Sequence, residues 1–127
     1  MVSRPERRPR SVYGVGEEPD PRFSLANERT ALAWMRTAVA FIAGGIALIS
    51  FADAGALPQW ALALGLAAVL GGAVVAIRGA RSWARIERAL RLGEPLPPPS
   101  GLFVVAAAVV VAAAVMAGIA VSGLVRG

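Results

Sequence analysis

Three long apolar blocks constrain this chain more than any other feature of its sequence. They cover residues 31–52, 57–77 and 101–125, and polar or proline-containing connections separate them. An α-helix rises about 1.5 Å per residue, so even the shortest block spans roughly 31 Å, enough for the ~30 Å hydrocarbon core of a bilayer. The sequence therefore predicts an all-α integral membrane protein with three transmembrane helices.

The composition agrees with this class and excludes several kinds of chemistry. Hydrophobic residues make up 57% of the chain's 127 residues, more than a soluble domain of this size can bury. Histidine and cysteine are absent. Disulfides, thiolate nucleophiles, histidine bases and His/Cys zinc sites are therefore excluded, and we expect neither an enzyme nor a metal or other cofactor.

The N-terminal region differs sharply from the rest of the chain. Residues 1–21 are polar, are broken by proline and glycine, and contain no apolar core that a cleavable signal peptide would need. Such a composition is typical of disorder. We expect a disordered cytoplasmic tail over residues 1–21, followed by a three-helix transmembrane domain over residues 22–127.

The second helix is predicted to continue beyond its apolar block. The helical period holds as far as Arg91, and Gly93 and Pro95 then stop the helix. Trp83, Ile86 and Leu90 share one face of this extension. Four arginines share another face and are candidates for contact with lipid phosphates or a partner protein: Arg78, Arg81, Arg85 and Arg88.

The arginines also predict the orientation of the chain in the membrane. All thirteen basic residues are arginine: seven precede or begin the first block, none lies in the 53–58 connection, five lie between residues 78 and 99, and one lies in the C-terminal tail. Cytoplasmic connections of membrane proteins carry an excess of positive charge. The N-terminus and the helical extension are therefore expected in the cytoplasm, and the C-terminus outside.

A candidate ligand site lies on the first helix. Arg22, Arg29 and Arg36 are seven residues apart, and seven residues return to nearly the same helix face, about 20° away. Small residues continue this stripe deeper into the block: Ala33, Ala40, Ala43 and Ala47. The arginines are either a cationic lining for an anion, made by several first helices around an axis, or a basic flank that contacts lipid phosphates.

Neighbouring polar residues have simpler interpretations as well. Glu28 is either the partner of an arginine in an ion pair or a gate that competes with an anionic ligand for Arg29. Asn27 and Thr30 can bond between helices or cap a kink. Small residues spaced four apart, which let membrane helices approach closely, occur in every block: Ala40/Gly44, Ala61/Gly65, Gly72/Ala76 and Ala114/Gly118/Ser122.

The segment from Leu25 to Thr37, with its Asn27-Glu28-Arg29-Thr30 centre, resembles the hallmark of the YidH-like family of small bacterial inner-membrane proteins. The later segment from Arg85 to Gly93 and the proline-rich spacer after it are also similar to that family. The resemblance covers residues 20–125 and implies a multi-pass protein of the bacterial inner (plasma) membrane, in a family without an established activity.

The same membrane domain is similar to that of the eukaryotic vacuolar transporter chaperone subunits, where it surrounds a pore for polyphosphate. The resemblance implies a homo-oligomer, a pentamer by analogy, and a pore-lining role for Arg22 and Arg29 with Glu28 as the acidic neighbour. Arg36 has no basic counterpart in those subunits, so its role in a lining is an extrapolation. The polymerase domain of those proteins is absent from this sequence.

Two hypotheses for the function follow. In the first, a homo-oligomer presents Arg22, Arg29, Arg36 and Glu28 to a polyanion such as polyphosphate, as a binding or conducting path. In the second, the chain is a non-catalytic scaffold or accessory subunit that contacts acidic lipids and a partner protein through its arginine-rich cytoplasmic face. Neither hypothesis involves nucleic acid.

Overall fold

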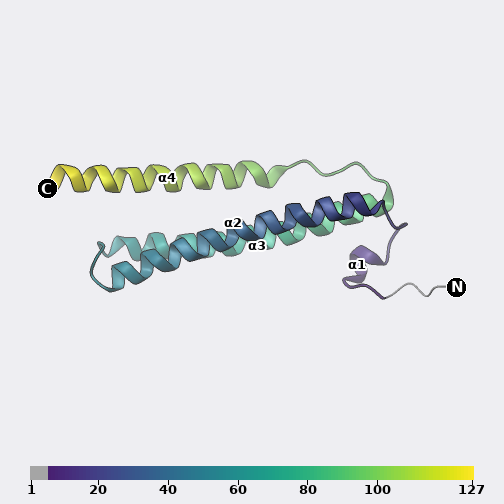
Figure 1. The fold of residues 1–127 in the computed structure, drawn as a ribbon, viewed down its shortest axis with the longest axis horizontal. Helices are drawn as coiled ribbons and strands as arrows, with labels where there is room; N and C mark the ends of the chain where they lie inside the picture. Colours follow the sequence, from purple (N-terminus) through teal and green to yellow (C-terminus); the bar gives the residue numbers. More distant parts are fainter. Residues whose placement is uncertain (1–5) are drawn as a thin grey trace. The chain divides into compact units, whose positions relative to one another are not determined.

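A computed structural model describes residues 6–127, and the regular secondary structure of these residues is α-helical (Figure 1). Its helices are α1 (Arg10–Tyr13), α2 (Pro21–Asp53), α3 (Trp60–Leu92) and α4 (Ser100–Arg126). Three of them are long and apolar enough to cross a membrane. The predicted class, an all-helical protein with three such helices, is confirmed. The chain divides into two compact units, which meet between Pro97 and Pro98 and are described separately.

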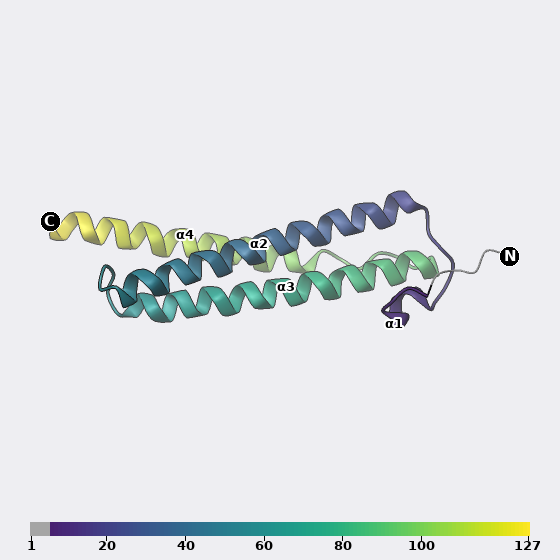
Figure 2. The same ribbon diagram turned by 60° about the horizontal axis from the view of Figure 1, so that its bottom comes forward.

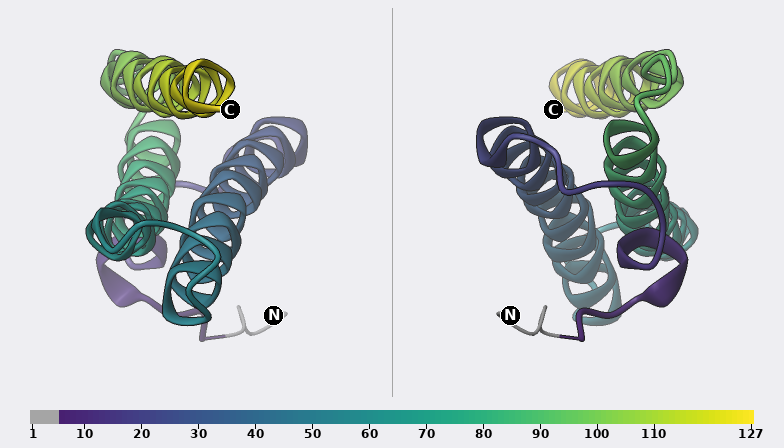
Figure 3. Two further views of the ribbon diagram at one scale, coloured as in Figure 1. Left: turned by 90° about the vertical axis from the view of Figure 1, so that its left-hand side faces the viewer. Right: turned by 90° about the vertical axis from the view of Figure 1, so that its right-hand side faces the viewer.

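In the first unit, α2 and α3 form an antiparallel hairpin (Figures 1 and 2). Viewed end-on, the two helices are inclined to each other (Figure 3). Each has 33 residues, a length of about 50 Å, which exceeds the ~30 Å hydrocarbon core of a bilayer. The hairpin is therefore longer than its apolar part, as the sequence predicted for the second helix.

Local sequence sets the ends of both helices. The Asp20 carboxylate accepts a bond from the Arg22 N–H at 2.9 Å and caps α2. Gly93, with φ 66°, ends α3 in the left-handed region that favours glycine. Helix α3 begins at Trp60, three residues after residue 57, where the second span was predicted to begin. The Leu57 N–H bonds to the Phe51 carbonyl, which places Leu57 in the connection between the helices.

Glycines allow the two helices to pack closely. A Cβ at Gly45 would lie 2.6 Å from the Gly65 carbonyl oxygen, and one at Gly72 would lie 2.8 Å from the Ala38 carbonyl oxygen. A Cβ at Gly79 would lie 2.7 Å from the Trp34 Cβ. Small residues permit such close backbone contact between helices in lipid, where dispersion replaces the hydrophobic effect as the attraction.

Residues 6–20 differ from the expected disordered tail. They contain α1 and lie along the end of α3 that is farthest from the hairpin turn (Figure 2). Val12 is buried, with 2% of its surface exposed. Specific contacts with α3, described below, hold this segment although its composition is polar. The remainder of the predicted tail, residues 1–5, lies outside the described residues.

The second unit consists of α4, which agrees within one residue at each end with the predicted span over residues 101–125. Its sequence is dominated by alanine and valine, and Ser122 satisfies its hydroxyl within the helix by donating to the Ile119 carbonyl at 2.8 Å. Such an internal bond is the usual way for a lone serine to be accommodated in an apolar helix.

Candidate functional site

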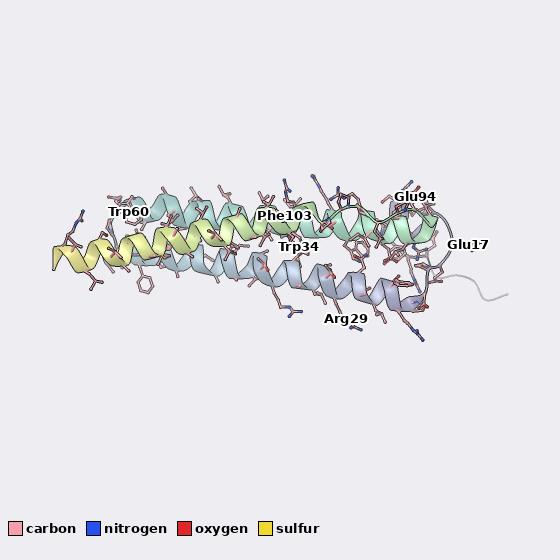
Figure 4. The ribbon with its side chains drawn as sticks, turned by 90° about the horizontal axis from the view of Figure 1, so that it is seen from above. Glu17, Arg29, Trp34, Trp60, Glu94 and Phe103 are labelled. Carbon is pink, nitrogen blue, oxygen red and sulfur yellow. The ribbon has the colours of Figure 1, made fainter. Side chains whose placement is uncertain are left out.

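The predicted arginine stripe lies on one exposed face of α2. Arg22, Arg29 and Arg36 are all exposed. The Arg29 side chain points away from α3, as Figure 4 shows. Among residues 6–127, no ion pair involves any of these three arginines. Their charges are therefore not neutralised within the part of the chain that the structure describes.

This face is opposite to the face of α2 that packs on α3. Asn27 and Gly45 are buried against α3. Arg36 is nine residues from each of them, which corresponds to a rotation of about 180° around the helix at about 100° per residue. The small residues predicted to continue the stripe are exposed as well: Ala33, Ala40, Ala43 and Ala47. The hairpin contact thus leaves the whole stripe uncovered.

Glu28 is exposed on the flank of α2, between these two faces. The ion pairs of the described residues do not include it, so the structure does not bring Glu28 onto Arg29 or Arg36. The Thr30 hydroxyl donates to the Ala26 carbonyl of its own helix at 3.1 Å. Of the two polar residues flanking Glu28 and Arg29, only Asn27 bonds between helices.

The arginine row of α3 is also exposed and lies opposite the side that packs on α2. Its members are Arg78, Arg81, Arg85 and Arg88. Trp83, Ile86 and Leu90 are partly buried, so the predicted division of this extension into two faces is confirmed. Arg88 differs from the other three because its guanidinium Nη1 donates to the Ser11 carbonyl at 2.8 Å.

The structure reveals a second site, a buried polar cluster of Ser24, Asn27, Glu87 and Arg91. Ser24 Oγ donates to Glu87 Oε1 at 2.8 Å, and Asn27 Nδ2 contacts Glu87 Oε2 at 3.4 Å and the Trp83 carbonyl at 3.1 Å. Only 3% of Glu87 and 6% of Asn27 are exposed. Both carboxylate oxygens therefore have donors from α2, and the cluster joins the two helices at the end far from their turn.

Arg91 completes this cluster from the C-terminal end of α3. Its Nε lies 3.8 Å from Glu87 Oε1. This Nε is buried and, within the described residues, has no hydrogen-bond partner. The guanidinium stacks over the Tyr13 ring, with 4.8 Å between its central carbon and the ring centroid. Arg91 is thus held by a carboxylate on one side and an aromatic ring on the other.

Sequence reasoning missed Glu87 and Arg91 as site residues. A signal for them was present: Trp83, Glu87 and Arg91 are spaced four apart on α3, and Ser24 and Asn27 are three apart on α2. Glu87 is also the lone acid in a stretch with five arginines, residues 78–91. Such an acid is usually solvated, and only the packing of α2 on α3 shows that it is buried.

Comparison with known proteins places the hairpin in a wider group. The model of a family described as a domain of unknown function, DUF202, matches residues 22–89. This range begins in the first turn of α2 and includes Glu87 but neither Arg91 nor the segment before α2. The match therefore covers the arginine stripe and most of the buried polar cluster.

Two relatives illustrate the similarity. The inner membrane protein YidH of Escherichia coli is 41% identical over 95 residues, which cover 75% of this chain and 83% of YidH. An uncharacterized protein of Mycobacterium tuberculosis is 37% identical over 94 residues, which cover 72% of this chain and 77% of that protein. No solved structure matches the chain significantly.

Proposed function

The chain belongs to the DUF202 family, and from this premise we propose that it is a multi-pass protein of the bacterial inner membrane whose α2 helices assemble around an axis and present arginines to a phosphate-rich anion. The residues that would contact the anion are Arg22, Arg29 and Arg36, with Glu28 beside them. In this proposal the N-terminus and the end of the hairpin far from its turn face the cytoplasm, and the C-terminus faces outside.

One observation carries the proposal: the face of α2 opposite to α3 bears the three arginines at one end, and the exposed alanines Ala40, Ala43 and Ala47 continue this stripe farther along. An arginine that faces lipid below the headgroups costs several kcal/mol. A face of small residues lets identical helices approach one another. Assembly of several copies on this face would remove Arg36 from lipid and close the alanine surface in a single step.

Spacing favours an extended anion over a small one. Seven residues of helix correspond to about 10 Å, so a symmetric assembly would carry rings of arginine about 10 Å apart along its axis. Each ring adds an attraction that an extended chain can use simultaneously, whereas a single phosphate meets one ring at a time. Polyphosphate has the required chemistry, a long chain with repeated negative charge.

A second function is favoured by the exposed row on α3. Arg78, Arg81 and Arg85 form no ion pair among the described residues, and they begin directly after the apolar part of α3 ends. Arginines at that depth attract acidic headgroups. In this alternative the chain is a non-catalytic scaffold, and the α2 stripe also contacts lipid.

Cysteines placed at Ala33 and Ala40 are expected to cross-link between copies much more readily than cysteines at Leu32 and Val39. The chain has no cysteine of its own, so each variant carries a single reactive site. All four positions are exposed in one copy, and the control positions lie on a neighbouring face of α2. Disulfide formation in native membranes, followed on a non-reducing gel, measures the difference. Equal cross-linking at all four positions would contradict assembly on the stripe.

Arg29→Ala is expected to weaken binding of long polyphosphate about tenfold or more. A charge-assisted contact contributes about 1.5–3 kcal/mol, and 1.4 kcal/mol corresponds to a factor of ten. Arg29→Lys should retain part of the affinity, because the charge remains while the planar fork is lost. Arg126→Ala, at the C-terminal end of α4, is the matched control and should have no effect.

The measurement is a titration of purified protein in neutral nanodiscs with long polyphosphate, short polyphosphate and inorganic phosphate. Affinity should rise with chain length and fall steeply with salt. Vesicles of anionic lipid added as competitor distinguish the two functions. If long chains bind no better than inorganic phosphate, while anionic vesicles bind and depend on Arg78, Arg81 and Arg85, the scaffold function replaces the first.

A further inference from the structure

Residues 9–17, here called the strap, cap the C-terminal end of α3. The last carbonyls of a helix have no partner within it, and the carbonyl of Arg91 accepts a bond from the Glu17 N–H at 3.0 Å. A second bond runs in the other direction, from Arg88 Nη1 to the Ser11 carbonyl at 2.8 Å. Figure 4 shows Glu17 at this end of the hairpin. A segment far away in the sequence thus supplies the cap of α3.

Gly16 makes this close approach possible. Its φ is +63°, and a Cβ at this position would collide with the carbonyl of Arg91. Any other residue would meet both backbone strain and this collision. A seated strap is therefore incompatible with a side chain at residue 16, which gives a direct way to unseat it.

Tyr13 holds the other end of Arg91, its guanidinium. The Tyr13 ring lies 4.8 Å from the guanidinium carbon, a distance at which a cation and an aromatic face attract each other. The same ring meets that of Trp83 at 6.2 Å between centroids, with the planes inclined by 56°. Val12 beside it is 2% exposed. The strap thus contacts Arg91 twice, at its main chain and at its side chain.

Arg91 in turn links the strap to α2. Its side chain is only 8% exposed, and its Nε lies 3.8 Å from Glu87 Oε1. The same carboxylate oxygen accepts the 2.8 Å bond from Ser24 of α2. Hydrogen bonds to a carboxylate are stronger where water is excluded. The Tyr13 ring, stacked on Arg91, therefore affects how strongly Glu87 holds α2.

We propose that the strap is a lock on the α2–α3 junction: it fixes Arg91 at both ends, keeps water from the Arg91–Glu87 pair, and so strengthens the bond between Glu87 and the first turns of α2. The strap and Arg91 lie outside residues 22–89, which match the DUF202 family, whereas Ser24 and Glu87 lie inside them. The lock does not rest on the proposed anion path, because none of its residues belongs to the α2 arginine stripe.

Two ion pairs near the strap take no part in the lock. Arg7 pairs with Glu18, and Arg10 pairs with Glu6, so both pairs join residues of the N-terminal segment to one another. More than half of each of these side chains is exposed. Exposed pairs contribute little to stability. Removal of one of them is therefore a control for the substitutions below.

Protection of the Glu17 amide against hydrogen exchange, measured in neutral nanodiscs, reports whether the strap is seated. Gly16→Ala and Tyr13→Ala should each lower this protection roughly tenfold or more. Tyr13→Phe keeps the ring and Arg10→Gln removes only an exposed pair, so both should stay near the wild-type value. Unchanged protection in both Gly16→Ala and Tyr13→Ala would overturn the seated strap.

Tyr13 and Ser24 are linked through Arg91 and Glu87 in this proposal, so energetic coupling between them tests the lock. Ser24→Ala should lower the folding equilibrium constant about tenfold in the wild-type chain and less than about threefold in the Tyr13→Ala chain. Thr30→Ala, whose hydroxyl bonds within α2, should have the same effect in both chains. Unfolding in mixed micelles of increasing SDS fraction supplies the constants. Independent effects of Tyr13→Ala and Ser24→Ala would overturn the lock.

Spin labels at Phe23→Cys and Leu92→Cys report directly whether α2 stays on α3. Both positions are exposed and the chain has no other cysteine, and dilution with unlabelled chain suppresses distances between copies. A single narrow distance should broaden when Tyr13→Ala is added and stay narrow with Tyr13→Phe. If the Glu17 amide loses its protection in Tyr13→Ala while this distance stays narrow, the strap caps α3 alone and does not lock α2.

Discussion

Gly72→Leu is expected to disrupt the α2–α3 hairpin, whereas Gly71→Leu at the adjacent position is expected to leave it intact. A Cβ at Gly72 would lie 2.7 Å from Ile42 Cγ1 and 2.8 Å from the Ala38 carbonyl oxygen, and main-chain atoms cannot move without separating the helices. A Cβ at Gly71 would meet no atom within 4 Å. Each substitution replaces one glycine of the same helix by leucine, and the two differ only in the direction in which the new side chain points.

The expected loss at Gly72 is about 3 kcal/mol or more, because forcing a large side chain into a packed contact commonly costs 1–3 kcal/mol and here the obstacle is backbone. Leucine favours helix over glycine by up to about 1 kcal/mol at both positions, so this gain cancels in the comparison. Unfolding in mixed micelles of increasing SDS fraction measures both variants against wild type. A similar loss at Gly71 would show that close packing at Gly72 is not the cause.

The sequence did not predict which glycines of α2 face α3. The blocks contain small residues on several faces, and Gly44 and Gly45 are neighbours only about 100° apart around the helix. The structure buries Gly45 against Gly65 and leaves open space around Gly44. The predicted pair Ala61/Gly65 is buried, but Ala40/Gly44 is exposed. Composition establishes the membrane class, whereas the contact face depends on how two helices align over their whole length.

The polar residues show the same division between local and long-range information. The arginine stripe on α2 follows from a period of seven within one helix, so the sequence alone places it on one face. Ser24 and Glu87 are 63 residues apart, and their contact depends on the register of the hairpin. Residues 6–20 look disordered by composition because they lack an apolar core. A few specific contacts with α3, with Tyr13 at their centre, hold the segment instead, and these contacts are not visible in the sequence.

Glu87→Ala is expected to destabilise the hairpin by about 3–5 kcal/mol, the usual consequence of removing one partner from a buried ion pair. The substitution removes the acceptor of Ser24 and Asn27 and leaves Arg91 buried without its carboxylate. Glu94→Ala is the matched control, because Glu94 is an exposed acid just beyond the end of α3 and the substitution changes the net charge equally. It should change stability by less than about 0.5 kcal/mol.

A double-mutant cycle distinguishes the cluster from a general loss of helix stability. Ser24→Ala should cost about 1–2 kcal/mol in the wild-type chain, because a hydrogen bond to a charged group is lost, and nearly nothing once Glu87 is alanine. The same cycle with Thr30→Ala, whose hydroxyl bonds within α2, should show no coupling to Glu87. The four unfolding curves of each cycle supply the measurement. Additive effects of Ser24→Ala and Glu87→Ala would mean that these two side chains do not interact in the membrane-embedded protein.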